Sequence, residues 1–263
     1  MAARGGDVME YRTQPEFAGQ TAVVVGGADG IGRASATLLS RRGARVACLD
    51  RNVDGAQRLV ESLGSEAPDA IALQTDVTDD RTVAAAIKEV ERRLGPISVL
   101  VNCAGITGVT DRRSQDVDVE DFDLVCRINL RGAFLLSQAV LAPMVAQGYG
   151  RVVHVASIAG KEGNAGMVAY SASKAGLIGM VKAQAKEYAQ TGVTINALAP
   201  AVIRTAMVEE MPATQVSYMT DRIPMGRTGT LAEAAEMIGW IVSPGCSFTT
   251  GFTFDLSGGR AVY

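Results

Sequence analysis

The chain alternates short, continuous apolar runs with longer segments in which apolar residues recur at helical spacing. The apolar runs cover residues 21–26, 45–50, 70–74, 99–102, 150–156, 193–199 and 252–256. Runs of Val, Ile, Ala and Leu without polar alternation are typical of strands that are covered on both faces. The helical segments cover residues 31–42, 53–63, 80–94, 121–147, 169–191 and 231–242. This alternation predicts an α/β fold, a doubly wound parallel sheet of about seven strands flanked by helices.

The chain has 263 residues and no linker or repeat, and we expect one domain over residues 19–263. Residues 1–18 are polar and charged and are expected to form a flexible tail. They hold no apolar stretch, so no signal peptide or membrane span is predicted. Pro143 lies within the 121–147 segment, where it should kink the helix or mark a boundary.

The charge and the cysteines exclude several classes of function. A net charge of −3 lacks the basic footprint of a nucleic-acid-binding protein, and no polybasic segment suggests membrane binding. The cysteines are widely spaced, form no Cys-x-x-Cys pair and are expected to be small core residues of a cytoplasmic protein: Cys48, Cys103, Cys126 and Cys246. The only histidine is His154, in a strand-like run, so we expect a structural histidine and no metal site.

The first predicted strand leads directly into the glycine-rich turn Gly26-Gly-Ala-Asp29-Gly30-Ile31-Gly32, which a helix follows. Glycines at such a turn let the backbone approach a pyrophosphate, and the helix N-terminus offers free N–H groups to its charge. The alternative is a tight turn without a ligand. Because the turn follows the first strand of an alternating chain, we expect a Rossmann-type nucleotide site.

The second predicted strand ends at Asp50, eighteen positions after Gly32. A carboxylate there can accept hydrogen bonds from both hydroxyls of an adenosine ribose and repels a 2′-phosphate. Asp29 adds negative charge to the turn, which also favours NAD over NADP. Arg51 leaves two alternatives open, since it can approach a 2′-phosphate or pair with Asp50. Asp50 can also simply cap the helix that follows.

The chemistry is indicated by Ser157 and the segment Tyr170-Ser-Ala-Ser-Lys174. Tyr170 and Lys174 are four residues apart and share one face of a helix. An ammonium beside a phenol favours the phenolate and should lower the pKa of Tyr170, making it an acid or base near neutral pH. Ser157 follows the fifth strand, at the end of the sheet where ligands bind. A lone Tyr-x-x-x-Lys is more often a surface pair, but here it accompanies the glycine turn, Asp50 and Ser157.

These motifs resemble those of the short-chain dehydrogenase/reductase family over roughly residues 20–263. The glycine motif matches Gly26, Gly30 and Gly32, with Val25 where Thr is usual. Further matches are Asp76 followed by Val77 in the adenine pocket, Asn102-Cys103-Ala104-Gly105 for the Asn-Asn-Ala-Gly segment, and Asn129, Ser157, Tyr170 and Lys174 for the catalytic tetrad. The usual thirteen-residue step separates Ser157 from Tyr170. The family's Pro-Gly is replaced by Pro200-Ala201, followed by Ile203 and Thr205 at the nicotinamide carboxamide.

The resemblance implies an NAD-dependent enzyme that interconverts a secondary alcohol and a ketone. In the oxidative direction Ser157 positions the alcohol, Tyr170 removes its proton and hydride passes to nicotinamide. Lys174 holds the nicotinamide ribose, and Asn129 anchors a water that relays the proton. The resemblance also implies a homotetramer, with interfaces from residues 121–147, 169–191 and 252–263.

The substrate pocket is expected between residues 107–120, 161–167 and 204–227. The last segment holds Met207, Met211, Met219 and Met225, which form either a flexible apolar lid or simple packing. Candidate cations for an anionic substrate are Lys161, Arg204, Arg222 and Arg227, for which plain solvation is the alternative. Likeness to family members that act on sugars and sugar acids favours a small polyol, sugar acid or hydroxy acid. Alternatives are a 3-oxoacyl thioester reductase, a dihydrodiol or cyclic-alcohol dehydrogenase, and a non-catalytic nucleotide-sensing or scaffold protein.

Overall fold

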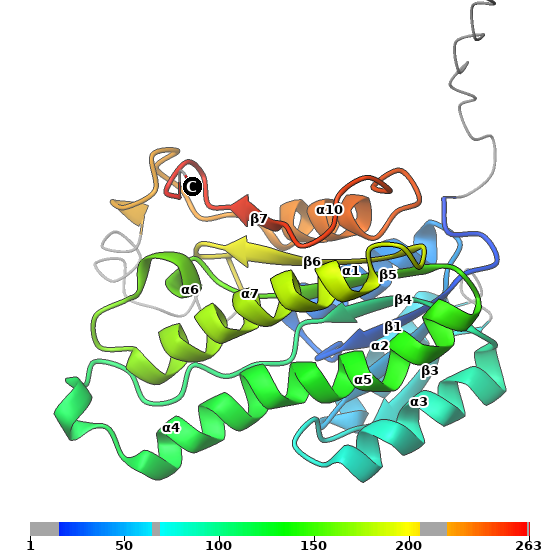
Figure 1. Cartoon of the computed structure of the whole chain (residues 1–263), viewed down its shortest axis with the longest axis horizontal. Coiled ribbons are helices and arrows are strands. Elements are labelled where there is room, and N and C mark those ends of the chain that lie inside the picture. The colour runs from blue at the N-terminus through cyan, green and yellow to red at the C-terminus, as the bar shows by residue number, and fades with distance from the viewer. Residues whose placement is uncertain (1–15, 65–68, 206–219, 262) are drawn as a thin grey trace, which may run out of the picture.

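The computed structural model describes residues 16–64, 69–205, 220–261 and 263 (Figure 1). Seven parallel strands form one sheet in the order β3-β2-β1-β4-β5-β6-β7. They are β1 (Thr21–Val25), β2 (Arg45–Asp50), β3 (Ile71–Gln74), β4 (Ile97–Asn102), β5 (Gly150–Val155), β6 (Val193–Pro200) and β7 (Thr253–Leu256). The predicted doubly wound parallel sheet is confirmed, and each strand begins and ends within two residues of its expected bounds.

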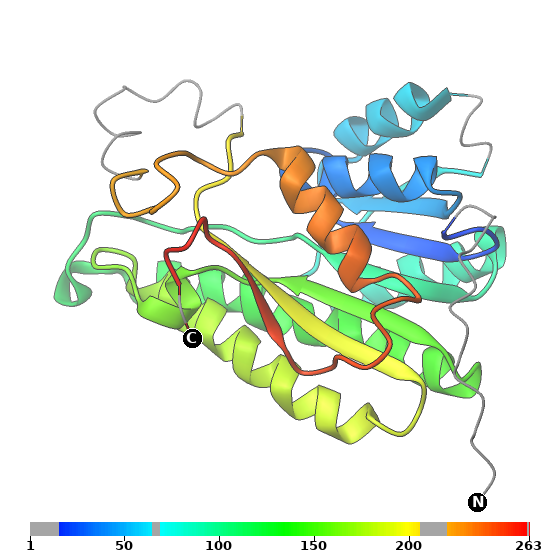
Figure 2. The same cartoon turned by 90° about the horizontal axis from the view of Figure 1, so that it is seen from above.

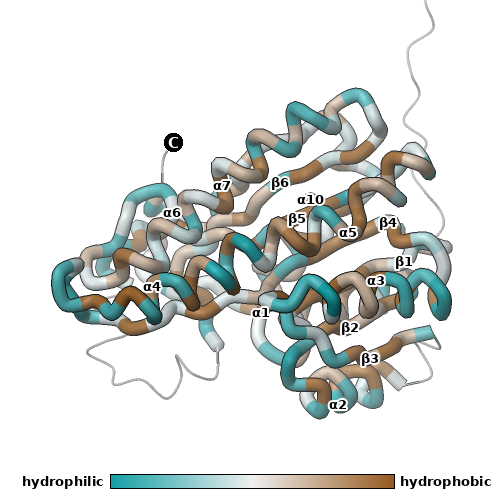
Figure 3. Tube along the Cα trace, turned by 60° about the horizontal axis from the view of Figure 1, so that its bottom comes forward, coloured by the Kyte–Doolittle hydropathy of each residue, from teal (hydrophilic) through white to brown (hydrophobic). Residues whose placement is uncertain are grey.

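Helices cover both faces of this sheet, as Figure 2 shows. One face carries α1 (Gly30–Arg41), α2 (Val53–Leu63) and α10 (Leu231–Ile241), and the other carries α3 (Asp80–Leu94), α5 (Gly132–Ala146) and α7 (Val168–Tyr188). Along β1, Val23 and Val25 pack in the core of the α3–α5–α7 face, whereas Ala22 and Val24 pack in the opposite core. Both faces of a strand are therefore apolar, which explains the absence of polar alternation. Figure 3 shows the apolar strands inside and polar residues on the outer turns of α2 and α3.

The segment expected as one helix over 121–147 is divided into three parts. It consists of α4 (Val119–Cys126), a π-helical turn η3 (Arg127–Arg131) and α5. The π turn brackets Asn129, and such turns often occur at functional sites. Pro143 lies inside α5 and neither starts nor ends it, so the boundary alternative is excluded, whereas the kink stays a prediction. The change of helical geometry lies at Asn129 instead.

The folded part of the chain begins earlier than expected. Phe17, placed in the tail by its sequence, is fully buried in the core beside α1 and α10, and its N–H donates to the carbonyl oxygen of Arg42 at 3.0 Å. Glu16 forms an ion pair with Arg42 at 3.2 Å. Residues 1–15 lie outside the described part of the chain.

One helical stretch, Val119–Ala146, is long and apolar enough to cross a membrane by length and composition alone. Half of its most apolar window is buried inside the protein, where α5 packs against the sheet. The core helix of a soluble protein satisfies the same criterion, so this stretch is weak evidence for a membrane span.

The strand order reverses at β1, with β2 on one side and β4 on the other. In open α/β sheets, ligands bind outside the carboxyl ends of the strands at this point. Five predicted site residues lie at or just after the carboxyl ends of strands: Gly26 after β1, Asp50 in β2, Asn102 in β4, Ser157 after β5 and Pro200 in β6. The fold thus brings the predicted site residues to one edge of the sheet.

Candidate active site

The glycine turn is packed against protein on one side and open on the other. A Cβ atom on Gly32 would lie 2.0 Å from the carbonyl oxygen of Gly26, and one on Gly26 would lie 2.8 Å from the backbone nitrogen of Ala104. Gly30 has a φ of +54°, and no protein atom lies within 4 Å of the place that its Cβ would take. Its neighbour Asp29 caps α1 by accepting from the N–H of Gly30 at 2.7 Å. A turn open above the N-terminus of α1 fits a pyrophosphate.

Asp50 is fixed by backbone donors on both of its carboxylate oxygens. Oδ2 accepts from the N–H of Ala28 at 3.0 Å, and Oδ1 accepts from the N–H of Asn52 at 2.8 Å. Asn52, not Asp50, is the N-cap of α2, which excludes the capping alternative for Asp50. Each carboxylate oxygen keeps a second lone pair, so the side chain still offers acceptors to a ribose diol. Asp50 also ties the glycine turn to the end of β2.

Asp76 and Val77 follow β3 at the same edge. Asp76 Oδ1 accepts from both the N–H and the hydroxyl of Thr78, at 2.8 Å each. These hydrogen bonds, with a smaller contribution from the charge of Arg51, lower the pKa of Asp76. Val77 is buried, and a Cβ on Gly132 would lie 2.9 Å from its side chain. Asp76 is thus held as an anion just after the end of β3.

The turn Asn102–Gly105 connects β4 to the catalytic side chains. Asn102 Oδ1 accepts from the N–H of Ala104 at 3.1 Å. The Cβ position of Gly105 lies 3.1 Å from Asn129 Oδ1 and 3.3 Å from Lys174 Nζ. Any side chain larger than hydrogen there would press on both groups. Burial raises the pKa of the Cys103 thiol to about 12, so the cysteine that replaces the family's second Asn stays protonated.

His154 is a structural residue that bridges two polar side chains. Its Nδ1 lies 3.1 Å from Asn102 Nδ2, and its Nε2 lies 3.0 Å from Ser137 Oγ. The amide oxygen of Asn102 accepts from Ala104, so its NH₂ group faces His154 and Nδ1 must accept. The proton of the neutral ring therefore lies on Nε2. Burial, with a contribution from the charge of Lys174, lowers the pKa of His154 to about 3.

Ser157, Tyr170 and Lys174 come together at the end of β5 and in the first two turns of α7. Ser157 Oγ accepts from the N–H of Ala159 at 3.1 Å, and the Ser157 side chain lowers the pKa of Tyr170. Lys174 Nζ donates to the carbonyl oxygen of Val155 at 2.7 Å and lies 5.7 Å from the centroid of the Tyr170 ring. In these described contacts Lys174 uses one of its three N–H groups, and two remain for hydroxyl acceptors.

Asn129 is buried in the π turn and is held by three hydrogen bonds. Its Oδ1 accepts from the N–H of Ile106 at 2.8 Å, and its Nδ2 donates to the carbonyl oxygen of Ile106 at 2.9 Å and to Ser173 Oγ at 3.0 Å. Both amide donors are thus used, and one lone pair of Oδ1 remains. Ser173 lies between Tyr170 and Lys174 in sequence, so Asn129 is tied to the helix that carries them.

The expected effect of Lys174 on Tyr170 is absent from this structure. Burial raises the pKa of Tyr170, and the hydrogen bond with Ser157 lowers it; the ammonium of Lys174 is not among the causes. Burial also lowers the pKa of Lys174 itself, to about 8. The predicted depression of the phenol pKa by Lys174 is therefore corrected. The physical reason is that both groups are desolvated, and Lys174 is directed to a backbone carbonyl.

The loop after β6 places Ile203 beside α10. Ile203 forms an isolated bridge with Gly229, and the N–H of Arg204 donates to the carbonyl oxygen of Gly229 at 2.7 Å. Pro200 accepts from the N–H of Ile158 at 3.0 Å, which links this loop to the residue after Ser157. Asp111 is the only non-glycine residue of the described chain with a positive φ, so Ala201 takes the place of the family's Gly without strain. Thr205 is the last residue of the described range 69–205.

Two of the four candidate cations are already paired with carboxylates. Lys161 Nζ lies 2.8 Å from an oxygen of Asp255, and Arg227 lies 2.7 Å from an oxygen of Glu233. Arg204 and Arg222 are also engaged in interactions within the protein. Of the methionines expected to form a lid, Met207, Met211 and Met219 lie outside the described residues, whereas Met225 is exposed.

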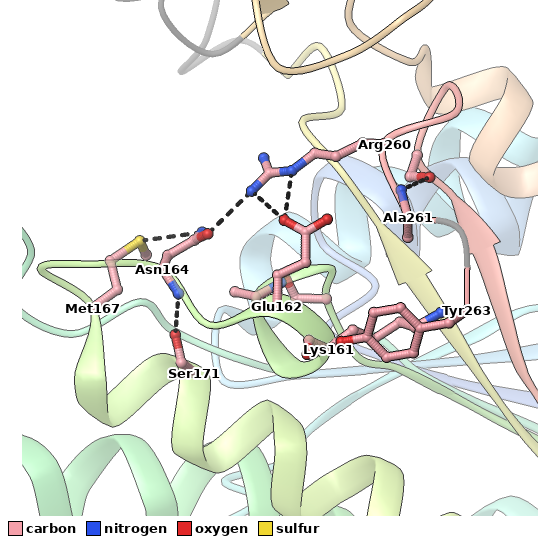
Figure 4. A network of polar contacts seen from close by, with 11 residues as sticks. Lys161, Glu162, Asn164, Met167, Ser171, Arg260, Ala261 and Tyr263 are labelled. Carbon is pink, nitrogen blue, oxygen red and sulfur yellow. Dashed lines mark hydrogen bonds and ion pairs between the residues drawn. The ribbon is translucent and has the colours of Figure 1, made fainter.

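Some residues of this region gave no signal in the sequence. Arg260 contacts Glu162 and Asn164 across 98 and 96 positions of the chain, respectively (Figure 4). Ser137 and Ser173 complete the hydrogen bonding of His154 and Asn129. Of Arg260, Ser137 and Ser173, only Ser173 lies within one of the predicted motifs, the segment Tyr170-Ser-Ala-Ser173-Lys174. The others become neighbours of the site only through the order of the strands.

The comparisons with known proteins match this geometry. Residues 20–216 match the family model described as short chain dehydrogenase. The chain is 43% identical over 247 residues to 2-dehydro-3-deoxy-L-rhamnonate dehydrogenase (NAD(+)) of Sphingomonas sp. (strain SKA58), covering 94% of this chain and 97% of that protein. The chain belongs to the short-chain dehydrogenase family. As a member, it is an oxidoreductase, and the predicted family resemblance is confirmed.

Two further relatives of this short-chain dehydrogenase extend the comparison. 3-Oxoacyl-[acyl-carrier-protein] reductase FabG of Pseudomonas aeruginosa is 37% identical over 243 residues, covering 92% of this chain and 97% of that protein. The crystal structure of gox2181 superposes with a TM-score of 0.89 at 33% identity, covering 93% of this chain and 96% of that one. Each of these two likenesses covers more than nine tenths of the chain.

Proposed function

We propose that this short-chain dehydrogenase oxidises a secondary alcohol group of a sugar acid, or of a related small polyol or hydroxy acid, with NAD. The observation that carries the proposal is that Ser157, Tyr170 and Lys174 meet at the edge of the sheet where Asp50 ends β2, with Lys174 Nζ 5.7 Å from the centroid of the Tyr170 ring. The identity of 43% to an NAD(+)-linked dehydrogenase of a dehydro-deoxy sugar acid supports both the substrate class and the cofactor.

The residues at the carboxyl edge fit NAD. Gly26, Gly30 and Gly32 would hold the pyrophosphate at the start of α1, and Asp50 would accept from the adenosine ribose. Asp76 and Val77 would border the adenine, and the segments Asn102–Gly105 and Pro200–Thr205 would border the nicotinamide half. A 2′-phosphate would be repelled by the negative charge of Asp50. The negative charge of Asp29 in the glycine turn would add to this repulsion. Arg51 instead faces Asp76 closely enough to lower its pKa.

Bound NAD supplies a nicotinamide carbon that accepts or returns hydride. The protein supplies the positions of the alcohol and of its proton. With substrate bound, Ser157 would donate its hydroxyl hydrogen to the substrate oxygen, while the N–H of Ala159 holds the Ser157 oxygen in place. Tyr170 exchanges the proton of that oxygen. Lys174 holds ribose hydroxyls with the N–H groups that Val155 leaves, and Asn129 retains one lone pair for a relaying water.

A reductase acting on a 3-oxoacyl thioester is the second candidate. It is favoured by identities of 34–37% to several FabG proteins over more than nine tenths of the chain. The two candidates differ in the direction of the reaction and in the charge of the substrate. The sugar-acid proposal requires a site for a carboxylate, whereas the reductase requires an open channel for a thioester arm.

A substrate panel decides between them. Purified protein would be incubated with NAD and sugar acids, polyols and 3-hydroxyacyl thioesters, and with NADH and 3-oxoacyl thioesters, with absorbance of NADH as the readout. We expect the highest kcat/KM for a sugar acid or hydroxy acid with NAD. A thioester preferred by more than about tenfold, equivalent to about 1.4 kcal/mol, favours the reductase.

Assembly and location belong to the same proposal. We expect one domain that assembles as a homotetramer in the cytoplasm, with all four cysteines reduced; each is free in the structure. Exposed apolar side chains support two contact faces. One face has Phe134 on α5 and Leu124 on α4. The other has Trp240 on α10 and Phe252, which directly precedes β7. Light scattering that gives a monomer would contradict the tetramer.

A further inference from the structure

The segment that joins Ser157 to Tyr170 is held by charged side chains from the end of the chain. Arg260 Nε donates to Glu162 Oε2 at 2.9 Å, and its Nη2 donates to Asn164 Oδ1 at 3.1 Å. Lys161 donates to both oxygens of Asp255 in β7, at 2.8 and 2.9 Å. Figure 4 shows Arg260 directed at Glu162 and Asn164, with the Tyr263 ring beside Lys161. We call the contacts of Arg260 with Glu162 and Asn164 the Arg260 fork.

Both cations of this region are half-buried and paired with carboxylates. The side chain of Arg260 is 10% exposed and that of Lys161 is 9% exposed, and each faces one carboxylate. Separating such a pair leaves the remaining charge partly shielded from water and without its partner. These cations therefore hold the segment and are poorly placed to recruit an anionic substrate.

The fork continues to the helix that carries Tyr170. The N–H of Asn164 donates to Ser171 Oγ at 3.1 Å, and the N–H of Ser171 donates to the carbonyl oxygen of Met167 at 2.9 Å. Met167 is the N-cap of α7, and its side chain caps nothing. The first turn of α7 is thus restrained by Asn164, whose side chain is in turn held by Arg260. Tyr170 is the third residue of this helix.

The other end of the segment is equally close to the site. Glu162 ends α6 (Ala159–Glu162), whose first residue donates its N–H to Ser157 Oγ. Arg260 therefore joins the helix that follows Ser157 to the loop that precedes Tyr170. A shift of either end changes the separation between the Ser157 and Tyr170 side chains.

We infer that Arg260 is a positioning residue, whose fork to Glu162 and Asn164 sets the spacing between Ser157 and Tyr170. The link to turnover rests on the proposed function of these two residues. The link to the phenol does not, because the Ser157 hydrogen bond acts on Tyr170 in the cofactor-free protein. Among the described residues, the charged group beside the phenol is Lys174 on α7, which itself interacts with Cys103 after β4 and with His154 in β5.

The test compares Arg260→Ala and Arg260→Lys with a control of similar chemistry. Arg42 also bridges distant elements through Glu16 and Glu236, on the face of α1 and α10, and Arg42→Ala removes those pairs without touching the segment 157–171. Each variant is made with and without Tyr170→Phe, and the difference in phenolate absorbance during an alkaline titration gives the pKa of Tyr170. Thermal unfolding, kcat and the KM for NAD are measured on the same samples.

We expect Arg260→Ala to raise the phenol pKa by about 0.5 or more as the Ser157 hydrogen bond weakens. It should lower kcat about tenfold or more and leave the KM for NAD within about twofold. Arg260→Lys should move both in the same direction by less, because a lysine keeps the charge but lacks the planar Nε and Nη2 donors with which Arg260 holds Glu162. It decides the question if Arg260→Ala does not fold. Arg42→Ala should lower the melting temperature and leave the phenol pKa and kcat unchanged.

The inference is overturned if the Arg260 variants behave like Arg42→Ala, with lower melting temperature but unchanged phenol pKa. It is also overturned if kcat falls without any movement of the phenol. If the parent protein oxidises nothing in the substrate panel, the proposed function fails, and the phenol titration alone still decides the role of Arg260.

Discussion

Lys174 Nζ donates to the carbonyl oxygen of Val155 at 2.7 Å and lies 5.7 Å from the centroid of the Tyr170 ring. The ammonium thus points to the end of β5, while the side chain that lowers the pKa of the phenol is Ser157. Burial moves the two pKa values in opposite directions, upward for Tyr170 and down to about 8 for Lys174. In the free protein Lys174 therefore loses its proton before Tyr170 does.

This order predicts an unusual response to substitution. In the cofactor-free protein, Lys174→Ala should leave the pKa of Tyr170 almost unchanged, because the ammonium has already lost its charge when the phenol ionises. Ser157→Ala should raise it, because the hydrogen bond that lowers it is removed. Phenolate absorbance, corrected with Tyr170→Phe, measures both. A large rise in Lys174→Ala and none in Ser157→Ala would reverse the assignment.

Asp50 should determine the preference between NAD and NADP. Asp50→Ala removes the ribose acceptor and the charge, so kcat/KM with NAD should fall about tenfold or more, while that with NADP rises. Asp54→Asn is the matched control, since Asp54 is an exposed acid in the first turn of α2. Binding titrations with both cofactors would check this. An Asp50→Ala protein that still discriminates against NADP would exclude the role.

His154 should be visible as one fixed, neutral tautomer. It is the only histidine of the chain, so ¹⁵N labelling of histidine gives signals from one ring. We expect the proton on Nε2, with Nδ1 accepting from Asn102, throughout the range from pH 5 to 8. An Nδ1–H tautomer, or a ring that titrates near its ordinary pKa, would contradict this arrangement.

The same residue should contribute to acid unfolding. The folded-state pKa of about 3 lies below the ordinary 6.5, so between these values the unfolded chain binds a proton that the folded protein does not. Stability must therefore fall as the pH is lowered through this range, by at most about 1.4 kcal/mol for each pH unit. His154→Asn, which keeps an acceptor for Asn102, should show a shallower fall in urea unfolding between pH 6.5 and 4. An unchanged slope would count against the buried neutral ring.

The sequence predicted the sheet well because each strand is apolar on both faces. β2, α2 and α3 begin and end at the expected residues, where polar or glycine residues border continuous apolar patterns. The π turn at Asn129 was missed, because one wider turn inside a long apolar segment leaves the helical pattern almost intact. α6 was missed because four residues are too few to show any period.

The candidate site was predictable only where its residues belong to short motifs. Ser157, Tyr170 and Lys174 were found by their spacing, and the structure brings them to one edge of the sheet. The direction of Lys174 was not predictable, since Val155 becomes its acceptor only through the packing of α7 on β5. Arg260 could not be predicted either, because its partners lie almost one hundred residues earlier. Such contacts follow from strand order, which local patterns do not contain.

The central claim is that Tyr170 exchanges the proton of the substrate oxygen. The most direct measurement is Tyr170→Phe, with NADH affinity by fluorescence titration and turnover on the best substrate of the panel. We predict a fall in kcat of about 100-fold or more, with the dissociation constant for NADH within about threefold of the parent. A variant that binds NADH normally and keeps more than about one tenth of the parent kcat would contradict the account.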